Sequence, residues 1–328
     1  MKVEQPPITA WKGCLVVKTD VLTLDGNATM ETYLLDWPYG PALLPMAVIC
    51  PGGGYLDCSP TEGECVALRF NNRNCHAAVL HYATAKSAPG ALPLSPAAGG
   101  PGRGHLPDPP QCPGLGGGVD PDRIVIVGFS AGAHLCALYS SYWNRKLLQA
   151  KGSPRQLRPN AVILGYPLAD EFMNRSDMQK KLQQEIDMER ITGEKKRRHR
   201  LQDFWQIAET AEFGCSDPTD EAMARQSPVE QVNADTAPTF VWTTFGDKLI
   251  SPIQSLRYAE ALYRAGVPCE LHVYQNGDHG LSLADASSAR KPEEILPHVG
   301  TWCSLALEWL EELFDAQKKE EEVTDAGI

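Results

Sequence analysis

Ser130 lies at the centre of the sequence Gly128-Phe129-Ser130-Ala131-Gly132, which follows a predicted strand and precedes a predicted helix. A serine in such a turn can act as a nucleophile, because the turn exposes its hydroxyl at a helix N-terminus, where developing negative charge is favoured. Side chains at the flanking positions would clash with the adjacent strand and helix, and Gly128 and Gly132 remove that clash. The pattern therefore predicts Ser130 as a catalytic nucleophile.

A glycine run, Gly52, Gly53 and Gly54, follows a short apolar run over residues 45–50. Attack of a serine on a carbonyl group creates an oxyanion, which is stabilised by backbone N–H groups that no side chain obstructs. We expect Gly53 and Gly54 to supply such donors together with the N–H of Ala131. A phosphate-binding loop is disfavoured, because no Gly-Lys-Ser/Thr sequence follows the glycines.

An acid and a base follow Ser130 in the chain. Asp247 comes directly after the penultimate predicted strand, and His279 lies in a glycine-flanked loop after the last one. His279 would take the proton from Ser130, and Asp247 would orient the imidazole and stabilise its charged form. Asp170, which follows an earlier strand, is the alternative acid. The sequence thus predicts a Ser-His-Asp triad.

The remaining histidines and acids near these positions have structural interpretations. His272 lies within a predicted strand and is expected to be a packed or surface residue. His134 is one turn into the helix that follows the nucleophile and is also expected to be structural. Asp278 adjoins His279 in the chain, but the side chains of sequence neighbours rarely face each other.

The elements that must hold these residues alternate between strands and helices. The predicted strands cover residues 14–22, 29–35, 45–50, 76–82, 122–127, 160–166, 239–244 and 270–274. The predicted helices cover residues 61–72, 131–142, 255–265 and 299–314. This alternation indicates βαβ units. We therefore predict an α/β fold with a mostly parallel central sheet, flanked by helices on both faces, in a single domain over residues 1–315.

Two further segments are polar. Residues 171–226 contain the charged run Glu194–Arg200, which is typical of a solvated helix face. An insertion at this place in the chain is also suited to form a lid beside the active site. The last segment, residues 316–328, has the composition of a disordered tail.

The composition disfavours several classes of partner. The net charge is −11, whereas nucleic acids and anionic membranes require a basic face, so we expect neither. The N-terminus lacks the apolar stretch of a signal peptide, and no run approaches the ~20 apolar residues of a transmembrane helix, so we expect a cytoplasmic protein. The ten cysteines contain no Cys-x-x-Cys pair, so we expect no structural zinc site.

Together these segments resemble the acetyl xylan esterase-like and other carbohydrate acetylesterases of the α/β-hydrolase superfamily. The similarity rests on AVICPGGGY, EGECVALRF, VDPDRIVIVGFSAGAHL, RPNAVILGYPL and the stretch from APTFVWTTFGDKL to GDHGLSLA. It implies the α/β-hydrolase fold and cofactor-free hydrolysis of small acyl esters by Ser130, Asp247 and His279. Where the family usually has a second glycine after the turn, this chain has Ala133. Tyr55 is expected to line the substrate pocket.

Residues 84–118 depart from that resemblance. In this stretch 17 of 35 residues are glycine or proline, and apolar periodicity is absent. The flanking strands should be parallel neighbours, which require a crossover connection that is normally a helix. We hypothesise either a surface loop or two compensating shifts of reading frame, which resequencing the gene would decide. If the stretch is genuine, one helix that covers the sheet is missing.

The sequence therefore predicts a serine esterase that hydrolyses small acyl esters, acetyl esters foremost, through an acyl-enzyme. A small-molecule or oligosaccharide ester is the expected substrate. Two alternatives stay open at this point. One is an amidase or peptidase of the same fold, and the other is a catalytically inactive hydrolase-like binding protein, against which the intact Ser, Asp and His argue.

Overall fold

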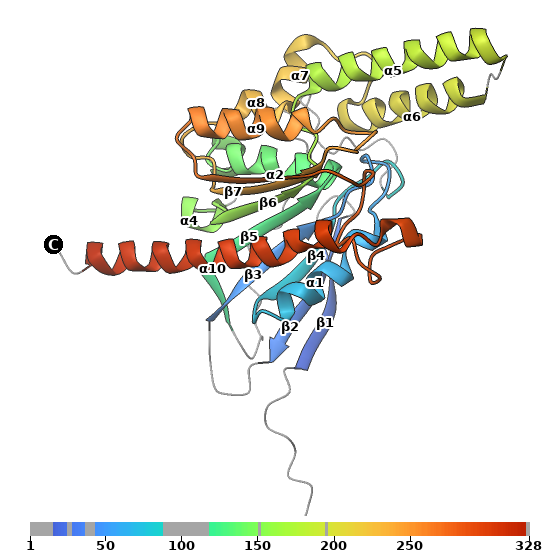
Figure 1. The fold of residues 1–328 in the computed structure, drawn as a ribbon. Helices are drawn as coiled ribbons and strands as arrows, with labels where there is room; N and C mark the ends of the chain where they lie inside the picture. The colour runs from blue at the N-terminus through green and yellow to red at the C-terminus, as the bar shows by residue number, and fades with distance from the viewer. Residues whose placement is uncertain are drawn as a thin grey trace, which may run out of the picture.

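The computed structural model describes residues 16–24, 28–36, 43–87, 118–149, 152–193 and 196–325. Their strands form one sheet in the order β1-β2-β4-β3-β5-β6-β7-β8 (Figure 1). The strands are β1 (Val16–Thr23), β2 (Thr29–Asp36), β3 (Leu43–Cys50), β4 (His76–His81), β5 (Gly118–Phe129), β6 (Ala161–Gly165), β7 (Thr239–Thr244) and β8 (Cys269–Tyr274). β1 and β2 run antiparallel to their neighbours, whereas every pairing from β4 to β8 is parallel. The predicted fold class is confirmed.

Helices cover both faces of this sheet (Figure 1). α1 (Glu64–Asn71) and α10 (Pro297–Asp325) pack on one face, where Val127 and Phe240 meet Trp302 in a fully buried cluster. α2 (Ala131–Tyr142) and α9 (Ile253–Arg264) pack on the other face, where Ile126 meets Tyr258. Adjacent strand residues point to opposite faces, so each central strand is apolar on both sides, as a covered parallel sheet requires.

β5 starts earlier than the sequence pattern predicts. Its register against β3 shifts between Leu44 and Met46, which pair with Val119 and Ile124 respectively. The extra residues between Val119 and Ile124 include Pro121, which has no N–H to give to a ladder. Regular pairing continues from Ile124 to Gly128, and this part of the strand leads directly to Ser130.

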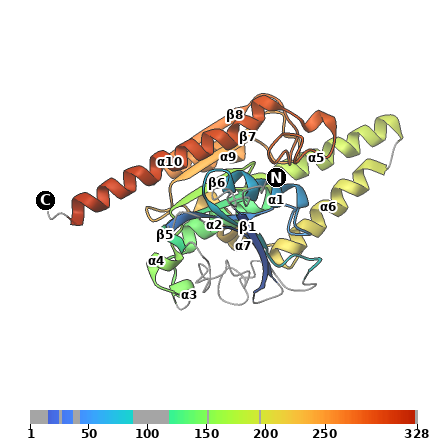
Figure 2. The same cartoon turned by 90° about the horizontal axis from the view of Figure 1, so that it is seen from below.

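The polar segment 171–226 is helical and lies over one end of the sheet. α5 (Glu171–Thr192) and α6 (Lys196–Phe213) run side by side and project from the body of the molecule in both views (Figures 1 and 2). α7 (Asp220–Gln226) and α8 (Pro228–Gln231) return the chain to β7. Asp170 begins α5 by accepting a hydrogen bond from the N–H of Met173, and Gly193 ends it with a φ of 75°. The side chains of the predicted charged run Glu194–Arg200 lie outside the described residues.

The remaining elements are short. α3 (Lys146–Gln149) and α4 (Pro154–Leu157) connect α2 to β6, and two 3₁₀ turns cover Pro60–Glu62 and Pro292–Glu294. Among the described residues, no helix combines the length and apolar character needed to span a bilayer. Most of the stretch 84–118, with its predicted loop or missing helix, lies outside the described residues, which stop at residue 87 and resume at 118.

The structure places residues 316–325 of the segment predicted as a disordered tail in a helix. α10 continues through residues 316–325, projecting to the end opposite α5 and α6 (Figure 2). Seven of these ten residues are lysine, glutamate, alanine or glutamine, which are strong helix formers and extend a helix that is already anchored on the sheet.

Candidate active site

Ser130 stands at the turn between β5 and α2 with a φ of 52° and a ψ of −118°, a conformation that costs free energy for a residue with a side chain. Its neighbours leave no room for side chains. A Cβ on Gly128 would lie 2.4 Å from the carbonyl oxygen of Gly132, and a Cβ on Gly132 would lie 2.0 Å from that of Cys50. Both glycines are therefore required by close backbone approach, and Ala133 fits in their vicinity, fully buried.

The loops after β5, β7 and β8 bring three predicted residues together. His279 Nε2 lies 2.8 Å from Ser130 Oγ, and His279 Nδ1 lies 2.7 Å from Asp247 Oδ2. The other oxygen of Asp247 accepts hydrogen bonds from the N–H groups of Leu249 and Ile250, at 2.8 and 2.9 Å. The Asp247 carboxylate is thus fixed and almost fully buried, with 1% of its side chain exposed. This geometry allows proton transfer from the serine to the imidazole.

The loop of residues 51–55, which we call the oxyanion loop, passes beside Ser130. Gly53 and Gly54 have φ values of 129° and 62°, which favour glycine, and a Cβ on Gly53 would lie 2.0 Å from the carbonyl oxygen of Asp57. Gly53, Gly54 and Ala131 line the same cavity as Ser130. The three predicted oxyanion donors therefore lie on the cavity that contains Ser130, as their predicted role requires.

The cavity has a volume of about 370 Å³, and α5 and α6 supply much of its wall. Its apolar lining from these helices and the adjoining loops consists of Leu168, Met178, Phe204, Trp205, Ala208, Leu249 and Ile250. Its polar lining consists of Ser59, Glu62, Asn174, Glu209, Glu212 and Arg290. A Cβ placed on Gly54 would lie 3.7 Å from the Phe204 ring, so α6 covers the oxyanion loop. The place predicted for a lid is thus next to the triad.

The alternative candidates lie elsewhere. Asp170, the reserve acid, caps α5 and pairs with Arg257 at 2.5 Å. Asp278 is exposed and pairs with Lys248 at 3.4 Å. His272 lies on β8, 2.7 Å from a carboxylate oxygen of the neighbouring Glu270. None of these acids or histidines contacts Ser130 in the described part of the chain.

Tyr55 lines the cavity with its ring, but its hydroxyl is engaged with His134 on α2. The Tyr55 Oη lies 2.6 Å from His134 Nδ1, and His134 Nε2 lies 2.6 Å from the carbonyl oxygen of Gln226. A carbonyl only accepts, so Nε2 carries the ring proton and Nδ1 accepts from the tyrosine. Burial lowers the pKa of His134 to about 4, which keeps the ring neutral.

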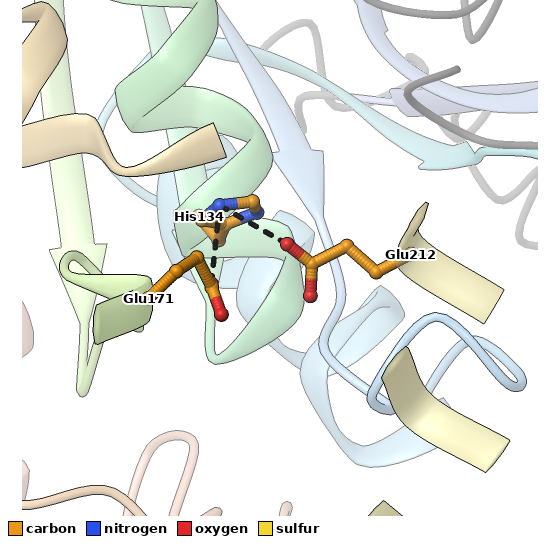
Figure 3. Close-up of side chains that lie close together, drawn as sticks. All are labelled: His134, Glu171 and Glu212. Atoms are coloured by element: carbon orange, nitrogen blue, oxygen red, sulfur yellow. Dashed lines mark ion pairs between the residues drawn. The ribbon is translucent and has the colours of Figure 1, made fainter. Parts of the chain in front are cut away.

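Two buried glutamates flank the same histidine, as Figure 3 shows. Glu171 Oε1 and Glu212 Oε1, from α5 and α6, each lie 3.7 Å from His134 Nε2. The residue types are those of a metal site. Both ring nitrogens of His134 are already hydrogen-bonded, however, so the ring has no lone pair left for a metal ion. The cluster is instead a polar junction between α2, α5 and α6.

The sequence reasoning missed two buried residues at the site, Glu62 and Tyr166. Glu62 is 3% exposed and lines the cavity, and Tyr166 lies edge-on to the imidazole of His279, with ring centroids 4.9 Å apart. For Glu62 the sequence offered one signal that could have revealed it. Glu62 is a charged residue in EGECVALRF, a stretch that the resemblance includes but to which it assigns no role.

Comparison with known proteins agrees with this geometry. A family profile described as the alpha/beta hydrolase fold matches residues 113–283, just over half of the chain. The chain belongs to the alpha/beta hydrolase family. The matched region includes Ser130, Asp247 and His279. The family predicted from the motifs is therefore confirmed.

Relatives of the chain carry related names. It is 28% identical over 250 residues to a protein of Butyrivibrio fibrisolvens named endo-1,4-beta-xylanase B, and 25% identical over 285 residues to the acetylxylan esterase of Xylanibacter ruminicola. These matches cover 73% and 86% of this chain, but only 32% and 49% of the relatives, so the chain spans about a third and half of their lengths.

A solved structure matches over nearly its whole length. The acetyl ester-xyloside bifunctional hydrolase from Caldicellulosiruptor lactoaceticus superposes with a TM-score of 0.59 at 25% identity, covering 87% of this chain and 88% of that one. The similarity thus extends beyond the turn around Ser130 to most of the fold.

Proposed function

We propose that this chain is a carboxylic ester hydrolase that removes small acyl groups, acetyl foremost, through an acyl-enzyme on Ser130. The observation that carries the proposal is the chain of hydrogen bonds from Ser130 Oγ through His279 to Asp247, at 2.8 and 2.7 Å, inside a cavity. The named acetylxylan esterase and acetyl ester-xyloside hydrolase among its relatives support the ester class.

In the first half of the reaction, Ser130 Oγ attacks the ester carbonyl while His279 Nε2 takes its proton. The negative charge moves to the carbonyl oxygen, where the N–H groups of Gly53, Gly54 and Ala131 would stabilise it. The imidazolium is stabilised by Asp247 and then protonates the departing alkoxide. Water repeats these steps on the acyl group and regenerates the serine.

The cavity supports a small substrate. Its volume of about 370 Å³ is near the lower end of the range of about 300–1,000 Å³ for small-molecule sites. Phe204 closes the space above Gly54, which suits a short acyl chain better than a long one. The polar groups on α5 and α6 give the other part of the cavity hydrogen-bonding capacity, which suits a hydroxylated alcohol such as a sugar.

The experiment is hydrolysis of p-nitrophenyl acetate by wild type and Ser130→Ala. We expect kcat to fall by about 10⁴-fold or more, because the nucleophile is lost. Ser216→Ala, at an exposed position between α6 and α7, is the matched control and should retain activity. A fluorophosphonate should label wild type and the control but not Ser130→Ala. Retained hydrolysis in Ser130→Ala would refute the assignment.

A substrate panel tests the acyl group and the ester class. p-Nitrophenyl acetate should be cleaved faster than the butyrate, and the butyrate faster than the octanoate. Acetylated xylo-oligosaccharides should release acetate, and p-nitroacetanilide should be a much poorer substrate than the matched ester. A preference for the octanoate would contradict the small acyl site, and efficient anilide cleavage would favour an amidase.

A further inference from the structure

Glu62 holds the first glycine of the oxyanion loop. It ends the 3₁₀ turn Pro60–Glu62, and its Oε2 accepts a hydrogen bond of 2.7 Å from the N–H of Gly52. A Cβ on Gly52 would lie 2.9 Å from both Glu62 Oε2 and the Cβ of Ser130. The loop is therefore clamped between this carboxylate and the nucleophile, and a shift at Glu62 moves the loop relative to Ser130.

The same carboxylate reaches the loop that carries His279. Glu62 Oε1 accepts a hydrogen bond of 2.6 Å from the Tyr166 hydroxyl, whose oxygen accepts one of 3.0 Å from the N–H of Ser282. Tyr166 and Ser282 have φ values of 41° and 51°, a left-handed backbone that these residues adopt only when their surroundings impose it. The network thus holds two residues with strained backbones: Tyr166, whose ring packs against that of His279, and Ser282, three residues after His279 in the chain.

We propose that Glu62 is a positioning residue for hydrolysis: its buried carboxylate sets the oxyanion loop and the His279 loop at a fixed distance around Ser130. This inference rests on the proposed function. Gly52 donates to one oxygen and Tyr166 to the other, so the geometry needs an acceptor on both sides, which a carboxyl group provides and a carboxamide does not.

The surroundings of Glu62 act on its pKa in opposite directions, with a net rise. Burial raises the pKa of Glu62, and the hydrogen bonds from Tyr166 and Gly52 oppose that rise, as do the positive charges of His279 and Arg290. Burial, followed by the charge of Glu62, raises the pKa of Tyr166 well above its usual value, so the tyrosine remains a donor.

The test is steady-state kinetics of Glu62→Gln on p-nitrophenyl acetate, with kcat normalised to the active sites counted by the acyl-enzyme burst. Glutamine keeps the shape but offers an acceptor on one side only. We expect kcat to fall by about 10- to 100-fold with KM changed by less than about threefold, because the oxyanion donors are misplaced while the cavity persists. Glu64→Gln, an exposed glutamate two residues away, is the matched control and should leave kcat unchanged.

Tyr166→Phe removes the other arm of the network and provides a second measurement if Glu62→Gln fails to fold. It should lower kcat in the same direction, and the double variant should be no worse than the more affected single variant, since both act through one network. Unchanged kcat in Tyr166→Phe, or effects of the two substitutions that multiply, would overturn the inference. If Ser130→Ala retains activity, the proposed function fails and this inference fails with it, whereas an inactive Ser130→Ala beside a fully active Glu62→Gln refutes the inference alone.

Discussion

The carboxyl pair at the junction of α2, α5 and α6 should make the stability of the protein depend on pH. Burial raises the pKa of Glu171 to about 8, and burial followed by the charge of Glu171 raises the pKa of Glu212 well above its usual value. Two carboxylates with oxygens within 4.8 Å of each other repel when both are ionised, so we expect them to share a proton at neutral pH. The shared proton links the first turn of α5 to the last turn of α6.

The sign of the effect follows from linkage. A carboxyl with a raised pKa binds more protons in the folded chain than in the unfolded one, so the free energy of unfolding falls as pH rises from about 4.5 toward 8. A rise from 4.5 to about 8 for Glu171 corresponds to an upper bound of about 5 kcal/mol, at about 1.4 kcal/mol for each pKa unit. His134 acts oppositely, because its lowered pKa costs stability only below its usual value of 6.5. Above pH 6.5 the carboxyl pair therefore changes the free energy of unfolding with pH, and His134 makes no contribution.

The assay is urea unfolding at pH 6.5, 7.5 and 8.5 for wild type, Glu212→Gln and Glu221→Gln. Wild type should lose a few kcal/mol over this interval. Glu212→Gln should lose much less, because an amide has no proton to release and can donate to the Glu171 carboxylate. Glu221, on α7 with 75% of its side chain exposed, is the matched control and should follow wild type. Contributions from other groups, the ten cysteines included, cancel between the two variants. Equal pH slopes in the two variants would refute the shared proton.

Two further predictions concern the catalytic geometry. Asp247→Asn should lower kcat on p-nitrophenyl acetate by about 10⁴-fold, because an amide does not hold the required tautomer of His279. Asp170→Asn should stay within about threefold of wild type, and equal kinetics for the two variants would contradict the triad. Gly132→Ala places a methyl group 2.0 Å from the Cys50 carbonyl oxygen, so it should slow fluorophosphonate labelling and cost about 1–3 kcal/mol in urea unfolding. Labelling at the wild-type rate would show that the turn around Ser130 tolerates a side chain at position 132.

The sheet and the turn around Ser130 could be predicted from sequence because the sequence patterns that indicate them are local. The strand before Ser130 is a continuous apolar run, the glycines stand at fixed offsets from it, and the chain order of serine, acid and base is that of the fold. The loops after parallel strands meet at one edge of the sheet, so placing each residue after its strand was sufficient to bring Ser130, Asp247 and His279 together.

The contacts that hold the site could not be predicted in this way. Glu62, Tyr166 and Ser282 are far apart in the chain, and each has an ordinary residue type for a loop or strand end. The packing of α5 and α6 over the cavity could not be predicted from the sequence either. Their apolar residues are not concentrated on one face, and the helices are polar over much of their length. The continuation of α10 beyond residue 315 was not predicted, because composition alone does not indicate the helix that this segment extends.

The oxyanion loop is held near both of its ends by side chains that take no part in the proposed chemistry. Glu62 fixes the N–H of Gly52, and His134 fixes the hydroxyl of Tyr55. The two glycines between them have positive φ values, and fixing the chain on either side of them restricts how far their N–H groups can turn. Donors that are held before the reaction need no reorganisation as charge develops, and this is where such a site gains most of its rate. Loss of either anchor should therefore lower kcat more than it weakens substrate binding, even though neither side chain takes part in the chemistry.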